Sequence, residues 1–152
     1  MNVLVIYDSM FGNTESIANA IGGAMESGGT VVVRPIAEVP SIPAHIDMLI
    51  VGGPTQAHGV DAQMKGYLEK LPDASVQGMA VAAFDTRLRW PKLLSGAASQ
   101  GIAERLERKG ARIVAEPESF LVERADGPLV EGERERAAAW GRHLIGAVAG
   151  AA

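Results

Sequence analysis

The chain has 152 residues, a length that suits one globular domain and is too short for two ordinary ones. Of these residues 47% are hydrophobic and 21% are charged, which is the composition of a globular protein. The net charge of −4 argues against general affinity for nucleic acid, because that affinity needs basic patches on the protein. The absence of cysteine excludes disulfides, thiolate nucleophiles and metal clusters held by sulfur.

The N-terminal residues predict where the protein is found. Strand-like sequence begins at Asn2 without a basic, apolar leader before it, so we expect no signal peptide. The longest apolar runs are too short to span a membrane. We therefore expect a cytoplasmic protein that binds neither membrane nor nucleic acid.

The first strand is predicted over residues 3–7, and it stops at the turn Asp8-Ser9-Met10-Phe11-Gly12-Asn13-Thr14. An amphipathic helix follows, with apolar residues at helical spacing: Ile17, Ala18, Ile21, Ala24 and Met25. A strand, a tight loop and a helix start bring free backbone N–H groups to one point, together with the positive end of the helix dipole. Residues 8–14 contain no lysine or arginine, so this loop predicts a phosphate bound by neutral hydrogen bonds. The alternative is that its polar residues only form the turn and cap the helix.

Strands and helices alternate through the rest of the chain. Further strands are predicted at residues 30–33, 47–51 and 79–84, and a last strand at 111–115 and 119–122 is interrupted at Pro117. Helices are predicted near 61–71, along Leu94, Ala98, Ile102 and Leu106, and from near Glu131, with Ala137, Trp140, Leu144 and Val148 facing inward. We expect one domain over residues 1–148 and a frayed tail over 149–152.

This alternation predicts an α/β fold, a doubly wound parallel sheet with helices on both faces. The loops at 8–14, 52–60 and 85–91 follow the first, third and fourth strands. Ligands of such sheets bind at the carboxyl ends of the strands, so these three loops predict one shared site. Gly52 and Gly53 are expected in the second loop, where backbone can approach a ligand closely.

Three other phosphate-binding patterns fit poorly. A P-loop needs a lysine and a hydroxyl residue after the glycine, and Asn13-Thr14 follows Gly12. A dinucleotide fingerprint needs three spaced glycines in this turn, and only Gly12 is present. A response-regulator receiver needs an aspartate at the end of the third strand, where Gly52-Gly53 stands.

The chain resembles the flavodoxin family in three places. Tyr7-Asp8-Ser9-Met10-Phe11-Gly12-Asn13-Thr14-Glu15 is similar to that family's phosphate loop, Gly52-Gly53-Pro54-Thr55 is similar to its second flavin loop, and Phe84-Asp85 stands where the third begins. The resemblance implies a three-layer, five-stranded parallel sheet of order 2-1-3-4-5, with FMN at the point where the strand order reverses. FMN is expected rather than FAD, because the loop resembles one that grips a terminal phosphate.

The resemblance implies a set of cofactor-binding residues. The phosphate is expected on the loop from Ser9 to Thr14 and the flavin ring between the loops at 54–59 and 85–90. The residues so assigned are Ser9, Met10, Phe11, Gly12, Asn13, Thr14, Pro54, Thr55, Gln56, His58, Gly59, Phe84, Asp85, Thr86, Arg87 and Trp90. No catalytic residue is assigned and no metal site is predicted.

The chain departs from the family pattern at the ring end. Phe11 replaces a hydroxyl residue, and Thr55-Gln56-Ala57-His58-Gly59 lacks the aromatic residue that usually covers one flavin face. Asp85-Thr86-Arg87 stands in place of a glycine-rich turn, which leaves Trp90 as the nearest aromatic ring. The plainer alternatives are a surface histidine at 58, an ion pair between Asp85 and Arg87, and a loop anchor at Trp90.

These departures favour an FMN-dependent oxidoreductase of the quinone-reductase or oxidase kind, with a small-molecule or protein redox partner. A cation such as Arg87 or Arg89 near the ring would stabilise the anionic reduced flavin. An uncovered ring face would leave room for a flat acceptor such as a quinone. One alternative is a flavodoxin that shuttles single electrons. The other is a domain that has lost FMN and serves in binding or regulation, which Phe11 and the missing aromatic residue of the second loop favour. The sequence leaves the oligomeric state open.

Overall fold

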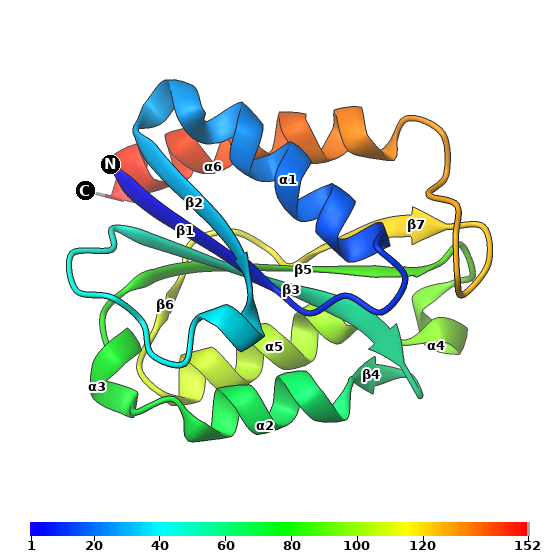
Figure 1. Ribbon diagram of the computed structural model, residues 1–152, viewed down its shortest axis with the longest axis horizontal. Coiled ribbons are helices and arrows are strands. Elements are labelled where there is room, and N and C mark those ends of the chain that lie inside the picture. Colours follow the sequence, from blue (N-terminus) through cyan, green and yellow to red (C-terminus); the bar gives the residue numbers. More distant parts are fainter. Residues whose placement is uncertain (152) are drawn as a thin grey trace.

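The protein is built on a parallel sheet, seen in a computed structural model that describes residues 1–151 (Figure 1). β1 (Asn2–Tyr7) lies between β2 (Thr30–Pro35) and β3 (Met48–Gln56), and β5 (Ala80–Leu88) pairs with the far side of β3. β6 (Arg112–Ile113) pairs with the start of β5, and β7 (Glu118–Val122) pairs with its end. β6 and β7 together form the interrupted fifth strand, so the predicted order 2-1-3-4-5 is confirmed.

Helices cover both faces of this sheet. α1 (Asn13–Met25) and α6 (Glu133–Ala151) cover one face, and α2 (Ala62–Lys70), α3 (Asp73–Val76) and α5 (Ala98–Arg108) cover the other (Figure 1). The short elements are η1 (Glu26–Gly28), η2 (Ile36–Glu38), β4 (Gly59–Val60) and α4 (Lys92–Ser95). β1 from Val3 onward and the start of β3 are apolar because both of their faces are buried.

The core therefore has two layers. Val3, Val5 and Tyr7 point toward α1 and α6, whereas Leu4 and Ile6 point toward α2 and α5. An edge-to-face cluster in the first layer joins β5, β7 and α6 through Phe84, Phe120 and Trp140, with ring centroids 6.0 to 6.3 Å apart. This cluster fixes β7 and α6 relative to the centre of the sheet.

β3 and β5 extend into segments that the sequence predicts as ligand loops. β5 continues from Phe84 to Leu88 because residues 84–88 pair with β7, so Asp85, Thr86 and Arg87 are strand residues and not loop residues. β3 continues through residues 52–56, so Gly52 and Gly53 lie inside a strand. A Cβ atom added at Gly52 would lie 2.1 Å from the Phe84 ring, so this glycine makes room for an aromatic core residue and not for a ligand.

The helix predicted along Leu94 and Ala98 is divided into α4 and α5. Gly96 stands between them with φ +73°, a left-handed conformation that favours glycine. A Cβ atom added there would lie 2.0 Å from the His58 carbonyl oxygen, so the α4–α5 loop packs directly on the turn between β3 and β4. Leu94 consequently lies outside the core, 58% exposed.

The last element of the chain is the helix α6. α6 continues through Ala151, and residue 152 lies outside the described residues. None of the helices in residues 1–151 has the length and apolarity needed to cross a membrane.

Candidate functional site

A hollow of about 530 Å³, including its open mouth, lies at the carboxyl ends of β1, β3 and β5, the edge that faces right in Figure 1. Ten predicted site residues line it: Ser9, Met10, Phe11, Asn13, Thr14, Pro54, Thr55, Gln56, Thr86 and Arg87. The structure thus brings residues from all three predicted loops to one place, as expected for the switch point of a doubly wound sheet.

The loop between β1 and α1 offers unpaired hydrogen-bond donors to this hollow. Ser9 Oγ accepts from the N–H groups of Gly12 and Glu15, at 3.1 and 3.4 Å. Within residues 1–151, the N–H groups of residues 10, 11, 13 and 14 have no hydrogen-bond acceptor. Gly12 itself, at φ +89°, has no atom within 4 Å of the position that a Cβ would take. The loop is an open cradle of neutral donors at the positive end of α1, the chemistry that suits a phosphate.

A buried hydroxyl pair joins this cradle to the sheet. Thr14 Oγ1 lies 2.8 Å from Thr86 Oγ1, and the two residues are 2% and 4% exposed. One hydroxyl donates to the other, so one proton of the pair remains free for a further acceptor. Sequence reasoning found both residues but not their contact, since Thr86 was expected in a loop.

The other end of the hollow is largely apolar. Three of its residues were not predicted: Leu88, Val122 and Ala125. Leu88 follows Thr86 by two residues on β5, so strand alternation places it on the same face. An aromatic side chain is also present, because Phe11 lines the hollow and is 56% exposed. Phe11 therefore supplies a ring beside the hollow, although the sequence suggested only the loss of a hydroxyl.

Arg87 is the cation that the structure places at the hollow. Its Nη1 donates to the carbonyl oxygens of Leu88 and Trp90, at 3.2 and 2.6 Å, and its buried Nε has no partner among the described residues. Arg89 is different, because its Nη1 lies 3.0 Å from Oε1 of Glu123. The Arg87 guanidinium thus donates to backbone carbonyls and to Ser95 Oγ, and no carboxylate lies within ion-pair distance of it in the part of the chain that the structure describes.

Two predicted site residues lie beneath the hollow. Phe84 and Asp85 are both 0% exposed, and Asp85 Oδ2 accepts from the N–H of Ser99 in the first turn of α5 at 2.8 Å. Burial raises the pKa of Asp85, opposed by the hydrogen bond from Ser99 and by the charge of Arg87. Asp85 acts here as a cap for α5, so its interactions in the structure are with the protein.

Three further predicted residues do not line the hollow. His58 and Gly59 belong to the hairpin that joins β3 to β4 and face a neighbouring hollow. Trp90 is 55% exposed, and its carbonyl oxygen receives the hydrogen bond from Arg87.

A pair of carboxyl groups stands next to the cradle. The pKa of Asp8 is raised to about 7, first by burial and then by the neighbouring Asp61 carboxyl, which acts through a hydrogen bond and through repulsion. Asp61 also accepts from the N–H of Met64 at 2.9 Å and so caps α2. The pair connects the end of β1 to the start of α2.

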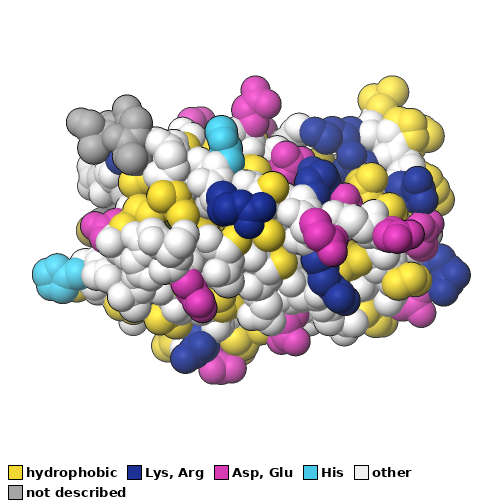
Figure 2. All heavy atoms as spheres, turned by 90° about the horizontal axis from the view of Figure 1, so that it is seen from above, with side chains coloured by type: hydrophobic (Ala, Val, Ile, Leu, Met, Phe, Trp, Pro, Cys, Tyr) yellow, Lys and Arg dark blue, Asp and Glu magenta, His cyan; other side chains and the backbone are white. Residues whose placement is uncertain are grey.

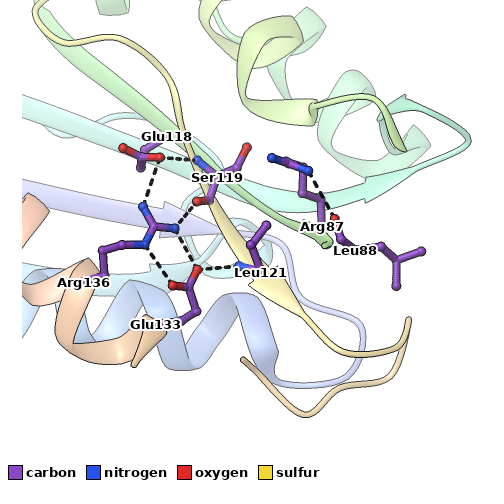
Figure 3. A network of polar contacts seen from close by, with 7 residues as sticks. All are labelled: Arg87, Leu88, Glu118, Ser119, Leu121, Glu133 and Arg136. Atoms are coloured by element: carbon purple, nitrogen blue, oxygen red, sulfur yellow. Dashed lines mark hydrogen bonds and ion pairs between the residues drawn. The ribbon is translucent and has the colours of Figure 1, made fainter. Parts of the chain in front are cut away.

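The wall at Val122 is held by a charged network (Figure 3). Arg136 on α6 donates to both carboxylate oxygens of Glu133 and to the carbonyl oxygen of Ser119, and it lies 3.2 Å from Glu118. Glu133 in turn accepts from the N–H of Leu121 at 2.7 Å. These contacts tie β7 to the start of α6, and they set the direction in which the chain leaves β7 toward Ala125.

Charge elsewhere is mixed. Acidic and basic side chains are interspersed over the face covered by α1 and α6 (Figure 2). In residues 1–151, no three histidine, aspartate or glutamate side chains form a group that could hold a metal ion.

Comparison with known proteins identifies the architecture. A family model described as flavodoxin matches residues 5–140. A flavodoxin structure from the domain Archaea superposes with a TM-score of 0.79 at 23% identity over 98% of this chain and 99% of that chain. A flavodoxin, WrbA-like protein from Agrobacterium tumefaciens superposes with a TM-score of 0.75 at 18% identity over 98% of both chains.

One curated sequence relative is named for an enzymatic activity. The NAD(P)H dehydrogenase (quinone) of Azorhizobium caulinodans is 31% identical in a match that covers 45% of this chain and 45% of that protein. The chain therefore spans about half the length of that relative.

Proposed function

The chain belongs to the flavodoxin family, and we propose that it binds FMN and passes electrons from a reduced nicotinamide donor to a quinone-like or protein acceptor. The bound flavin would supply the capacity to accept a hydride and release its electrons in one or two steps. The proposal places the site within one flavodoxin-like domain over residues 1–148 of a cytoplasmic protein.

The observation that carries this proposal is the cradle at residues 9–14. Its donors are neutral and its backbone N–H groups lack partners within the described chain, so a bound phosphate would satisfy groups that otherwise have only water. Ser9 and Gly12 set the turn that keeps these N–H groups convergent, and Thr14 would add a hydroxyl.

The apolar end of the hollow fits a flat ring. Pro54, Leu88 and Val122 provide apolar walls, and Phe11 provides an aromatic face at the mouth. Arg87 would place a cation without an ion-pair partner beside the ring and favour its anionic reduced form. At 4 Å and an effective dielectric near 20, the gross attraction between two unit charges is about 4 kcal/mol, enough to affect the reduction potential.

The nicotinamide donor and the quinone acceptor are proposed from the name of the Azorhizobium relative, of which the chain covers 45%. The hollow supports this choice, because its mouth is open and a flat acceptor could approach the ring from solvent.

The first experiment is titration of the purified protein with FMN and with riboflavin, followed by flavin fluorescence. FMN is expected to bind at least about 100-fold more tightly, since two charge-assisted hydrogen bonds at 1.5–3 kcal/mol each exceed that factor. Equal affinity for the two flavins would show that residues 9–14 do not anchor the cofactor. A protein that ignores both would support a flavin-free binding or regulatory module.

The second experiment tests the donor and acceptor. Anaerobic mixing of the FMN-loaded protein with NADH or NADPH should bleach the visible flavin absorbance, and a benzoquinone should restore it. Failure of both donors, with normal reduction by dithionite, would favour an electron shuttle served by a protein partner.

A further inference from the structure

A second hollow lies on the other side of the β3–β4 hairpin, and we propose that it binds a phosphate group of the nicotinamide donor. The identity of this ligand rests on the proposed function, whereas the phosphate-binding chemistry does not. The hollow measures about 720 Å³, including its open mouth, and no predicted flavin-binding residue other than His58 and Gly59 lines it.

Positive charge converges on this hollow from three elements. Lys65 comes from α2, Lys92 from α4 and Arg105 from α5, and His58 stands on the hairpin between them. Among the described residues neither lysine has a carboxylate partner within ion-pair distance. The one acid in the lining, Glu104, lies 3.9 Å from Arg108. A chain with net charge −4 thus concentrates cations at one place, where they would attract a multiply charged anion.

The floor of the hollow is backbone and small residues. Gly96 touches the His58 carbonyl so closely that a Cβ atom would lie 2.0 Å from its oxygen. A Cβ atom at Gly101 would lie 2.7 Å from Val60 and 3.1 Å from the Arg105 guanidinium. These glycines let α4, α5 and the hairpin pack closely against one another. The long basic side chains form the walls of the hollow, which leaves room for a compact anion such as a phosphate.

The hairpin holds an unfavourable backbone conformation at the border of the two hollows. Ala57 and His58 have φ of +46° and +68°, both left-handed, in a two-residue turn where asparagine and glycine are usual. Such strain persists where the surrounding structure holds it, and it occurs often at ligand sites. Its effect here is to turn His58 toward the second hollow while Gln56 lines the first.

The two hollows are close enough for one donor. The Cα atoms of Gln56 and His58 are at most about 7.6 Å apart, because consecutive Cα atoms are 3.8 Å apart. In a nicotinamide dinucleotide one ribose separates the reactive ring from the pyrophosphate. A donor whose ring reaches the first hollow past Gln56 would therefore bring its pyrophosphate toward His58, at the border of the second hollow.

The test compares a Lys65→Gln, Lys92→Gln double variant with a Lys70→Gln control. Lys70 is an exposed lysine on the same helix as Lys65 and does not line the hollow. Anaerobic stopped-flow reduction of the FMN-loaded proteins gives the half-saturating donor concentration and the limiting rate. Calorimetric titration of the flavin-free proteins with adenosine diphosphate gives a binding constant that is independent of the flavin.

In the double variant we expect the half-saturating donor concentration to rise about tenfold at an unchanged limiting rate, and the affinity for adenosine diphosphate to fall by a similar factor. Equal losses with NADH and NADPH would support the inference, whereas a loss with NADPH alone would contradict it, because the geometry brings the pyrophosphate and not the 2′-phosphate to this hollow. A double variant that matches Lys70→Gln in both measurements would overturn the inference. In that case normal flavin reduction would leave the proposed function intact, whereas a protein that binds adenosine diphosphate but no FMN would contradict the proposed function alone.

Discussion

Thr14 and Thr86 share one buried hydrogen bond between segments that are 72 residues apart in sequence. Replacing Thr14 with the isosteric valine leaves the Thr86 hydroxyl buried without its partner. We expect this to lower the free energy of unfolding by about 1–3 kcal/mol, and the same for Thr86→Val alone. The double variant should be nearly as stable as the wild type, because both partners are then apolar. Urea unfolding of the four proteins measures this coupling.

Thr30→Val is a suitable control, since this exposed residue begins the edge strand β2 and should change stability by less than about 0.5 kcal/mol. If the losses of the two single variants simply add in the double variant, the hydroxyl pair contributes nothing as a pair.

Individual residues could be predicted where their role is local. Ser9, Asn13 and Thr14 stand at a helix start, and the preference of such residue types for that position depends only on the local sequence. The roles of Leu88 and Val122 depend on the pairing of β5 with β7, which brings together distant parts of the sequence. Ala57 gave no turn signal, because alanine is not a residue type that prefers left-handed backbone.

At the scale of elements, neighbouring glycines in β3 have opposite environments. A Cβ atom at Gly52 would lie 2.1 Å from the Phe84 ring, whereas one at Gly53 would meet Met64 and Ile102 at 3.7 and 3.9 Å, which is ordinary contact. Gly52→Ala is therefore expected to destabilise the protein by about 1–3 kcal/mol through overpacking. Gly53→Ala should be neutral or slightly stabilising, because alanine restricts the unfolded chain more than glycine does. Thermal unfolding of the two variants is the measurement.

Gly52→Ala combined with Phe84→Leu should recover part of the loss, because the smaller side chain makes room for the added methyl group. Equal stability of the two alanine variants would contradict the packing role of Gly52.

Element boundaries were predicted less well than element types, and the reasons are tertiary. The apolar run 79–84 indicated a strand, but its polar continuation over 85–88 is held by β7 and not by its own sequence. Leu94 and Ala98 have helical spacing, yet the contact between Gly96 and His58 interrupts the helix. The interruption at Pro117 was predictable, since proline cannot donate to a ladder and acts locally.

At the scale of the whole molecule, the direction of three pKa shifts predicts how stability depends on pH. Asp8 and Asp85 have pKa values raised by burial, so the folded protein binds more protons than the unfolded chain, and stability falls as the pH rises. For Asp8 this loss of stability occurs between pH 3.8, the ordinary pKa of the group, and about pH 7, its pKa in the folded protein. The pKa of Glu133 is lowered: burial opposes this, but hydrogen bonds from Arg136 and Leu121 outweigh the burial. Glu133 therefore stabilises the fold above its usual pKa and loses this effect as the pH falls through its folded pKa.

We expect maximal stability at mildly acidic pH, between the titration of Glu133 and that of Asp8. Asp8→Asn removes a carboxylate that is partly buried and repelled by Asp61. It should raise the free energy of unfolding at pH 8 by about 1–2 kcal/mol and leave it nearly unchanged at pH 4. The full shift from 3.8 to about 7 would give roughly 4 kcal/mol, and partial exposure to water reduces that figure. Glu133→Gln should act on the acidic side of the maximum: it should lower the free energy of unfolding at pH 7, and this loss should shrink toward pH 3. Urea titrations across this range decide the matter: a stability profile in Asp8→Asn that parallels the wild type from pH 4 to pH 8 would show that the Asp8–Asp61 pair does not shape it.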